Sequence, residues 1–119
     1  MQAGLRKIGI ESKLVAETWP TLSGKAANVE TTPDIWTNWV STLYADPQNW
    51  VGEMYNSKNW GNWKTGSWYK NPKVDELIDK LKTELSEKKR AELAHEASKI
   101  HLADVGHLPL HYQVIPWAM

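Results

Sequence analysis

Tryptophan is concentrated in one stretch of this 119-residue chain, between residues 36 and 68. The tryptophans of this stretch are Trp36, Trp39, Trp50, Trp60, Trp63 and Trp68. The chain has no phenylalanine, although phenylalanine supplies apolar volume without an indole N–H that needs a hydrogen-bond partner when buried. The pattern favours recognition of a flat, apolar or cationic ligand, with ordinary packing as the alternative role of each single ring.

The charges in this part of the chain narrow the class of ligand. Residues 26–57 contain no lysine or arginine but include Glu30, Asp34, Asp46 and Glu53. An aromatic and acidic segment suits neutral or cationic ligands, through stacking, cation–π attraction and carboxylate hydrogen bonds. Over the whole chain 14 basic residues balance 14 acidic ones, which argues against recognition of nucleic acid or anionic membranes by bulk electrostatics.

Metal and catalytic chemistry have little support in the sequence. The four histidines are His95, His101, His107 and His111. The first two are six residues apart on a predicted helix and face different ways, and the last two, on one face of a strand, lack a carboxylate partner. Cysteine is absent, and we find no nucleophile elbow, no phosphate-binding glycine loop and no HExxH motif. We predict no metal site, no cofactor and no enzymatic activity.

The N-terminal half is predicted to mix strands with short helices. Residues 5–9 resemble the last turn of a helix that ends at Gly9, and residues 10–16 alternate as a half-buried strand does. Residues 18–28 favour a short helix, and residues 34–40 a second strand. Asp46 and Pro47 then form a helix-start signal, with Asp46 as N-cap. We expect that helix to reach about residue 54, and residues 56–70 to form a long loop.

The C-terminal half has a clearer helical pattern. Asn71 and Pro72 predict the start of a helix whose apolar residues recur at helical spacing: Val74, Leu77, Ile78, Leu81 and Leu85. Ser86 can cap a second helix that runs to about residue 104, with Gly106 as its stop. The two helices form an antiparallel hairpin or a sharp corner, because almost nothing joins them. Residues 108–112 predict a short strand, and the few strands with a C-terminal pair of helices predict an α/β fold class.

Four segments, taken in order, resemble the C-terminal lobe of the ABC-transporter solute-binding proteins that include the oligopeptide- and dipeptide-binding proteins (extracellular solute-binding protein family 5). They are LRKIGI at 5–10, Trp39 with YADPQNW at 44–50, YKNPKVDELID at 69–79, and EKKRAEL at 87–93 with its continuation to residue 110. The second and third are similar to the family's "GW…DYPDPDNF" and "YxNPxVDxLID" patterns. The resemblance extends over nearly the whole chain.

This resemblance implies an α/β fold of two lobes that close on a solute and then dock on the permease subunits of an importer. It implies that residues 1–119 form a partial C-terminal lobe that is truncated at both ends. The implied partners are a small solute such as a peptide or sugar, the permease, and the rest of its own protein. The implied location is the periplasm or the extracellular face of a bacterial membrane. The family has no catalytic residues.

The resemblance also implies a binding site. Trp39 matches the family's cleft tryptophan, and the peptide-ammonium aspartate is replaced by Leu43, which cannot pair a positive charge. A neutral or sugar-like solute is therefore at least as well suited as a peptide, with Ser41 and Thr42 as hydrogen-bonding groups and Tyr44 beside them. Trp36 is a further candidate, but on a regular strand it and Trp39 point to opposite faces. Asp46 is better explained as an N-cap than as a substitute anchor.

A free-standing carbohydrate-binding module, with exposed tryptophans stacked on sugar rings, is the alternative function. Such modules are usually all-β, and the strong helices after residue 71 count against this alternative.

Overall fold

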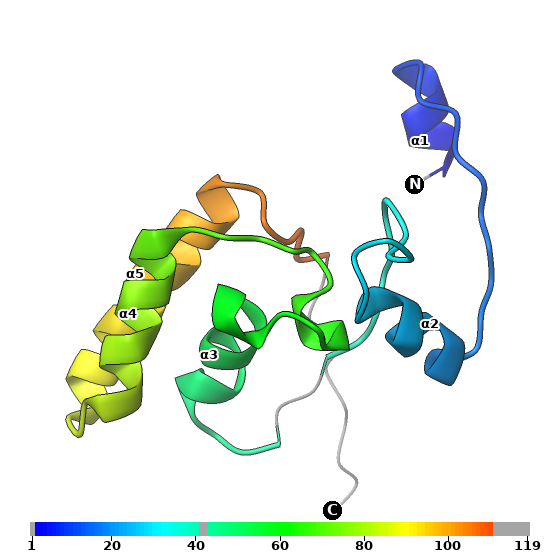
Figure 1. The fold of residues 1–119 in the computed structure, drawn as a ribbon. Helices are drawn as coiled ribbons and strands as arrows, with labels where there is room; N and C mark the ends of the chain where they lie inside the picture. Colours follow the sequence, from blue (N-terminus) through cyan, green and yellow to red (C-terminus); the bar gives the residue numbers. More distant parts are fainter. Residues whose placement is uncertain (1, 41–42, 111–119) are drawn as a thin grey trace, which may run out of the picture.

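The computed structural model describes residues 2–40 and 43–110, and all regular structure in these ranges is helical (Figure 1). The α-helices are α1 (Gln2–Lys7), α2 (Trp19–Ala26), α3 (Val51–Met54), α4 (Pro72–Thr83) and α5 (Glu87–Ala103). The single-turn 3-10 helices are η1 (Pro47–Asn49), η2 (Ser57–Asn59) and η3 (Trp63–Thr65). The predicted α/β fold class is therefore wrong for the part of the chain that the structure describes.

The segments predicted as strands lack partners in the described ranges. Residues 10–18 and 36–40 carry no regular structure, and neither do residues 108–110, the described part of the third predicted strand. Ile10 and Leu14, two apolar residues of the segment predicted as a half-buried strand, are exposed. Alternation shows which side chains share a face, but a strand is stable only when neighbouring strands satisfy its backbone and cover that face.

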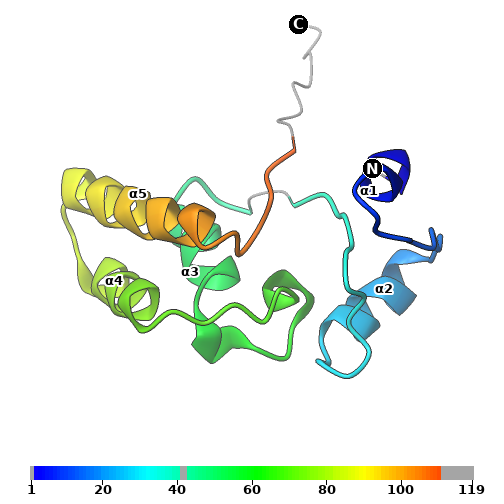
Figure 2. The same ribbon diagram turned by 90° about the horizontal axis from the view of Figure 1, so that it is seen from above.

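Helices α4 and α5 form an antiparallel hairpin, as Figures 1 and 2 both show. Asn71 at the start of α4 contacts Asp104 at the end of α5, while the carbonyl of Leu81 near the end of α4 accepts a hydrogen bond from Arg90 near the start of α5. The predicted cap of α4 is confirmed, because the Asn71 side chain accepts from the backbone N–H of Lys73 at 3.0 Å.

The hydrophobic core lies where the hairpin packs on α3. Its buried members are Val51, Val74, Leu77, Ile78, Leu81, Ala94 and Ala97. The helical spacing of the α4 residues predicted this face correctly, with one exception. Leu85 lies beyond the end of α4 and is 95% exposed. Small alanines on α5 let the two helices approach closely.

The helix predicted from residue 47 to about residue 54 is not continuous. The side chain of Asp46 accepts from the backbone N–H of Gln48 at 2.7 Å, which confirms the predicted N-cap. The helix that follows is divided into η1 and α3, with Trp50 between them. Residues 56–70 form the predicted loop, and the side chains of Asn56 and Asn62 cap its two 3-10 turns.

Helices α1 and α5 end in the same hydrogen-bonded turn. In α1, the N–H of Ile10 donates to the carbonyl of Leu5, and Gly9 has a φ of +82°. In α5, the N–H of Gly106 donates to the carbonyl of His101, and Val105 has a φ of +56°. This is the Schellman arrangement, in which glycine normally takes the left-handed position. Gly9 was predicted there correctly, whereas the α5 turn places a valine at that position.

Helices α1 and α2 lie on the opposite side of the molecule from the hairpin (Figures 1 and 2). Helix α1 has no buried residue, and α2 buries only Ala26. None of the helices in residues 2–40 and 43–110 has the length and apolarity needed to cross a membrane.

Candidate functional site

The segment between α2 and η1 presents large apolar side chains to solvent. We call Ile35, Trp39, Leu43 and Tyr44 the 35–44 surface, since each is exposed and each lies between α2 and η1 at a described residue outside any helix or strand. Trp39 is 56% exposed and Leu43 is 80% exposed. Exposed aromatic and aliphatic groups of this kind can stack on a solute or pack against another protein surface.

The two candidate tryptophans have different surroundings. Trp36 is half-buried, and a Cβ added to Gly66 would lie 2.7 Å from its Cζ2 atom and 3.2 Å from the Cβ of Ala26. The Trp36 ring therefore packs over a glycine of the long loop beside the end of α2. Trp39 is the more accessible of the two rings. The assignment of both to a ligand site stays a prediction, as does that of Ser41 and Thr42, which lie outside the described residues.

Asp46, at the end of this segment, is engaged within the protein. One guanidinium nitrogen of Arg90 lies 2.6 and 2.8 Å from its two carboxylate oxygens. Hydrogen bonding from Arg90, and then from the backbone N–H of Gln48, holds the pKa of Asp46 below its ordinary value. The other guanidinium nitrogen of Arg90 donates to the carbonyls of Leu81 and Glu84. Asp46 therefore ties the end of the 35–44 surface to the hairpin.

The tryptophans of the long loop, Trp60, Trp63 and Trp68, make contacts within the protein. Trp60 donates its indole N–H to the carbonyl of Tyr69, and Trp68 donates to the hydroxyl of Thr32 at 2.8 Å. The rings of Trp60 and Trp68 meet edge-on at 5.7 Å. Trp63 packs edge-on against the tryptophan that begins α2, with 4.9 Å between ring centroids. These indoles join the loop to α2 and to the segment after it.

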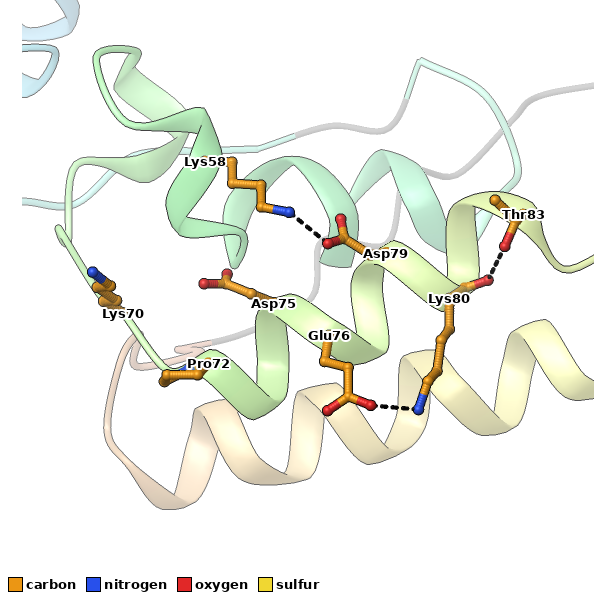
Figure 3. A pocket seen from close by; sticks show the side chains of 8 residues that line it. All are labelled: Lys58, Lys70, Pro72, Asp75, Glu76, Asp79, Lys80 and Thr83. Atoms are coloured by element: carbon orange, nitrogen blue, oxygen red, sulfur yellow. Dashed lines mark hydrogen bonds and ion pairs between the residues drawn. The ribbon is translucent and has the colours of Figure 1, made fainter.

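A groove of about 560 Å³ runs along α4 beside η2 and is lined mostly by charged side chains (Figure 3). Lys58 pairs with Asp79 at 2.6 Å, and Lys80 pairs with Glu76 one turn away on α4. Asp75 accepts hydrogen bonds from the backbone N–H and the hydroxyl of Ser57. These carboxylates are already satisfied by protein groups, so the groove is explained as a surface ion-pair network.

A cluster of aromatic and imidazole rings closes the end of the hairpin. His101 is fully buried, stacked on Tyr55 with 3.7 Å between ring centroids and edge-on to Tyr69 at 4.4 Å. Its Nε2 atom lies 2.7 Å from Nδ1 of His107. Burial, and then the proximity of His107, lowers the pKa of His101 to about 3. Burial likewise lowers the pKa of His107.

A carboxylate network borders this ring cluster. The Tyr69 hydroxyl donates to Asp104 at 2.7 Å, and Asn71 donates to the same oxygen at 2.8 Å. Burial and the hydrogen bond to Asp104 raise the pKa of Tyr69 to about 12. The hydrogen bonds from Tyr69 and Asn71 lower the pKa of Asp104. No group of three potential metal ligands occurs among residues 2–40 and 43–110.

Sequence reasoning missed the contact between His101 and His107. It paired His95 with His101 and His107 with His111, assigning each pair to one helix or one strand. The observed pair instead spans the end of α5, where the chain turns back over its own last turn. Gly106, the predicted helix stop, lies directly against the His101 ring, but the left-handed residue of the turn is Val105, and a valine gives no sequence signal for such a turn.

A relative was found among known proteins. The chain is 32% identical over 74 residues to the oligopeptide-binding protein OppA of Bacillus subtilis (strain 168). The match covers 62% of this chain and 13% of the length of that protein. No protein-family model matches the chain, and no solved structure matches it significantly.

Proposed function

We propose that this chain is part of the solute-binding component of an ABC importer of the oligopeptide-binding type (family 5). The observation that carries the proposal is the 32% identity to an oligopeptide-binding protein over 74 residues. The chain contributes to one lobe, and its partners are the rest of its own two-lobe protein, a small solute and the permease subunits. The protein then works in the periplasm or on the extracellular face of a bacterial membrane.

The 35–44 surface is the proposed solute-contacting part of this lobe. Trp39 and Tyr44 offer exposed aromatic rings, which provide a large contact area at a small cost in side-chain entropy. Ser41 and Thr42 contribute hydroxyls, and Trp36, whose ring packs over Gly66, is a further candidate for solute contact. Arg90 and Asp46 fix one end of this segment to the hairpin, which limits the freedom that solute binding would have to remove.

The proposed solute is a peptide or another small polar molecule. If the solute has an ammonium group, residue 43 does not bind that group. Leu43 is exposed and uncharged, and a buried ammonium without a partner is strongly destabilising. Asp46 does not replace the missing anchor, because Arg90 already pairs both of its oxygens. Peptides therefore bind through their backbone and side chains at this wall of the site.

Neither an enzyme nor a carbohydrate-binding module is proposed. The relative is a binding protein by name, and solute binding requires no catalytic residue. A carbohydrate-binding module of the all-β kind does not fit the helices that make up the regular structure of the described residues.

The DNA on either side of this reading frame tests the class of protein. We expect coding sequence for the rest of a two-lobe binding protein, or genes for importer permeases close by. Flanking sequence that encodes a different type of protein, with no importer genes near it, would contradict the proposal.

An NMR titration tests the site itself. We expect trialanine and its N-acetylated form to shift the indole N–H signal of Trp39 to a similar extent, because Leu43 does not distinguish the free amine. Affinity should be weak, since the chain supplies one wall of the site. The indole of Trp19, exposed on α2, serves as the control that should not move. A response to cellotriose without any response to the peptides would contradict a peptide-like solute.

A further inference from the structure

The turn after α5 is held in a strained conformation. Val105 has a φ of +56°, and a left-handed conformation is unfavourable for a β-branched residue because its Cβ crowds the backbone. The equivalent turn after α1 has Gly9 in this position and carries no such strain. Strained residues of this kind persist only where surrounding contacts hold them, and they are common in segments that switch.

The contacts that hold this turn converge on His101. Its ring lies against Gly106 so closely that a Cβ on Gly106 would come within 2.4 Å of the ring Cε1 atom. Tyr55 at the end of α3 and Tyr69 before α4 pack on the same ring. His107, the first side chain beyond the turn, reaches back to the ring with a 2.7 Å contact. The turn is therefore fastened to the body of the protein through two imidazoles.

Only one hydrogen can lie between the two facing imidazole nitrogens. Nε2 of His101 faces Nδ1 of His107, and one nitrogen must donate while the other accepts. The second ring nitrogen of His101, Nδ1, is buried and has no hydrogen-bond partner among the described residues. When both rings are neutral and Nε2 of His101 carries the hydrogen, Nδ1 of His101 has no hydrogen, so no donor is left unsatisfied at that atom.

Every cationic form of the closed pair leaves an unsatisfied N–H on His101. If His101 carries the charge, both of its nitrogens have hydrogens, and Nδ1–H has no acceptor. If His107 carries the charge, its Nδ1–H must donate to Nε2 of His101, which again moves the hydrogen of His101 to Nδ1. If both are charged, two N–H groups face each other. A buried donor without an acceptor is destabilising, so protonation opposes closure.

The other titratable groups around the pair do not remove this conflict. Tyr55 and Tyr69 pack their rings on His101, and the Tyr69 hydroxyl donates to Asp104. Asp104 attracts a proton to His101, but its effect is smaller than those of burial and of His107. The oxygen of Asp104 that Tyr69 and Asn71 contact is already shared between two donors.

We propose that His101 and His107 form an acid-sensitive latch, which holds the strained turn at Val105 and Gly106 closed near neutral pH and releases it as the pH falls below about 6. The proposal goes beyond solute capture and does not depend on it. The direction follows from the pKa of His101, which is lowered from 6.5 to about 3 in the closed form. Closure is favoured above pH 6.5 and weakens as the pH falls toward 3. Between pH 7.5 and 5.0, this one histidine makes opening about 30-fold more favourable.

Hydrogen exchange of the full chain tests the latch. The backbone N–H groups of Val105 and Gly106 are hydrogen-bonded in the closed turn. We expect their protection factors to fall by about tenfold or more between pH 7.5 and pH 5.0, while those of Ile78 and Leu81 in α4 stay unchanged. The double variant H101F/H107Q, which titrates at neither position, should lose this response, and H95Q, at an exposed histidine of the same helix, should keep it.

Three results would overturn the latch. The first is equal protection of the turn at both pH values, and the second is a loss that also appears in the double variant. The third is a parallel loss across α4, which would indicate global acid unfolding. If the double variant does not fold, the NMR titration of the wild-type imidazole rings decides. The His101 and His107 rings must titrate over the pH range in which the turn opens, and titration of both rings with the turn still protected would contradict the proposal.

Discussion

The α4–α5 hairpin and the segments around residues 8–15 and 35–44 place their apolar residues in opposite environments. In α4, Val74, Ile78 and Leu81 are fully buried. In the N-terminal segment, Ile8 and Leu14 are exposed, Leu14 to 84%. Both regions have a regular apolar pattern in sequence, so pattern alone does not explain why only one of them forms a core.

The difference follows from what each backbone needs. A helix satisfies its own N–H and C=O groups, and α4 requires only one neighbouring helix and α3 to cover its apolar face. An extended segment requires a neighbouring strand for its backbone as well as a layer for its side chains. The hairpin therefore buries its apolar face within this chain. The apolar side chains at residues 8–15 and in the 35–44 surface stay exposed, and under the proposed function we expect the rest of the protein to cover them.

The largest effect is expected from removing a core residue of the hairpin. Ile78→Ala should lower the free energy of unfolding by about 2–5 kcal/mol, since it leaves a cavity between the helices. Leu85→Ala, at a residue of the same pattern that is 95% exposed, is the matched control and should change it by less than about 0.5 kcal/mol. Urea unfolding measures both. Similar losses in the two variants would show that the hairpin is not the independent core described above.

The next effect concerns the link between the two regions. Arg90→Ala removes the donor to Leu81, Glu84 and Asp46 together, and should lower the free energy of unfolding by about 1–3 kcal/mol. Lys88→Ala, on the exposed side of α5, should leave the urea midpoint unchanged. An unchanged midpoint for Arg90→Ala would mean that residues 44–46 are not fastened to the hairpin.

The Arg90 variant should also change the dependence of stability on pH. Arg90 lowers the pKa of Asp46 from 3.8 in the folded protein. This contribution is present above about pH 4 and is lost as the pH falls through the folded value. Asp46 contributes to the fall in the free energy of unfolding at acid pH. In Arg90→Ala, this contribution should become smaller.

The sequence predicted the helical parts of the fold better than the rest, for physical reasons. The cap at Asn71, the apolar spacing of α4 and the cap at Asp46 are local signals, and local hydrogen bonds decide them. Strand pairing is a long-range property, and alternation in residues 10–16 does not say whether a partner exists. The α/β assignment failed at that step.

The family resemblance, and not a local pattern, pointed to Trp39, and the ligand role of that ring stays a prediction. Trp68 donates a hydrogen bond to Thr32, 36 positions away, and nothing in the segment around Trp68 specifies that contact. The Arg90–Asp46 pair joins residues 44 positions apart, and no spacing rule connects them. The His101–His107 contact depends on a turn whose left-handed residue is Val105, and a valine gives no sequence signal for that conformation.

A smaller effect, of opposite sign, is expected at this turn. Val105→Gly should raise the free energy of unfolding by up to about 1 kcal/mol, because relief of the left-handed strain exceeds the entropy that glycine adds to the unfolded chain. Val15→Gly, in the extended segment where no strain is relieved, should be neutral or slightly destabilising. The turn in Val105→Gly should also open at lower pH than in the wild type. Destabilisation by Val105→Gly would show that the turn stores no strain.

The smallest effect on stability, and the most direct view of the exposed region, comes from the double variant W39S/L43S. Both side chains are exposed, so we expect the free energy of unfolding in urea to change by less than about 0.5 kcal/mol. Binding of a fluorescent dye to apolar surface and self-association at high concentration should both decrease, because Trp39 and Leu43 are large apolar side chains exposed to solvent. Leu85→Ser removes one exposed leucine from the hairpin and should leave both readouts as in the wild type. A loss of stability above about 1 kcal/mol in W39S/L43S would place this surface within the core. The contrast between the buried apolar face of the hairpin and the exposed 35–44 surface would then fail.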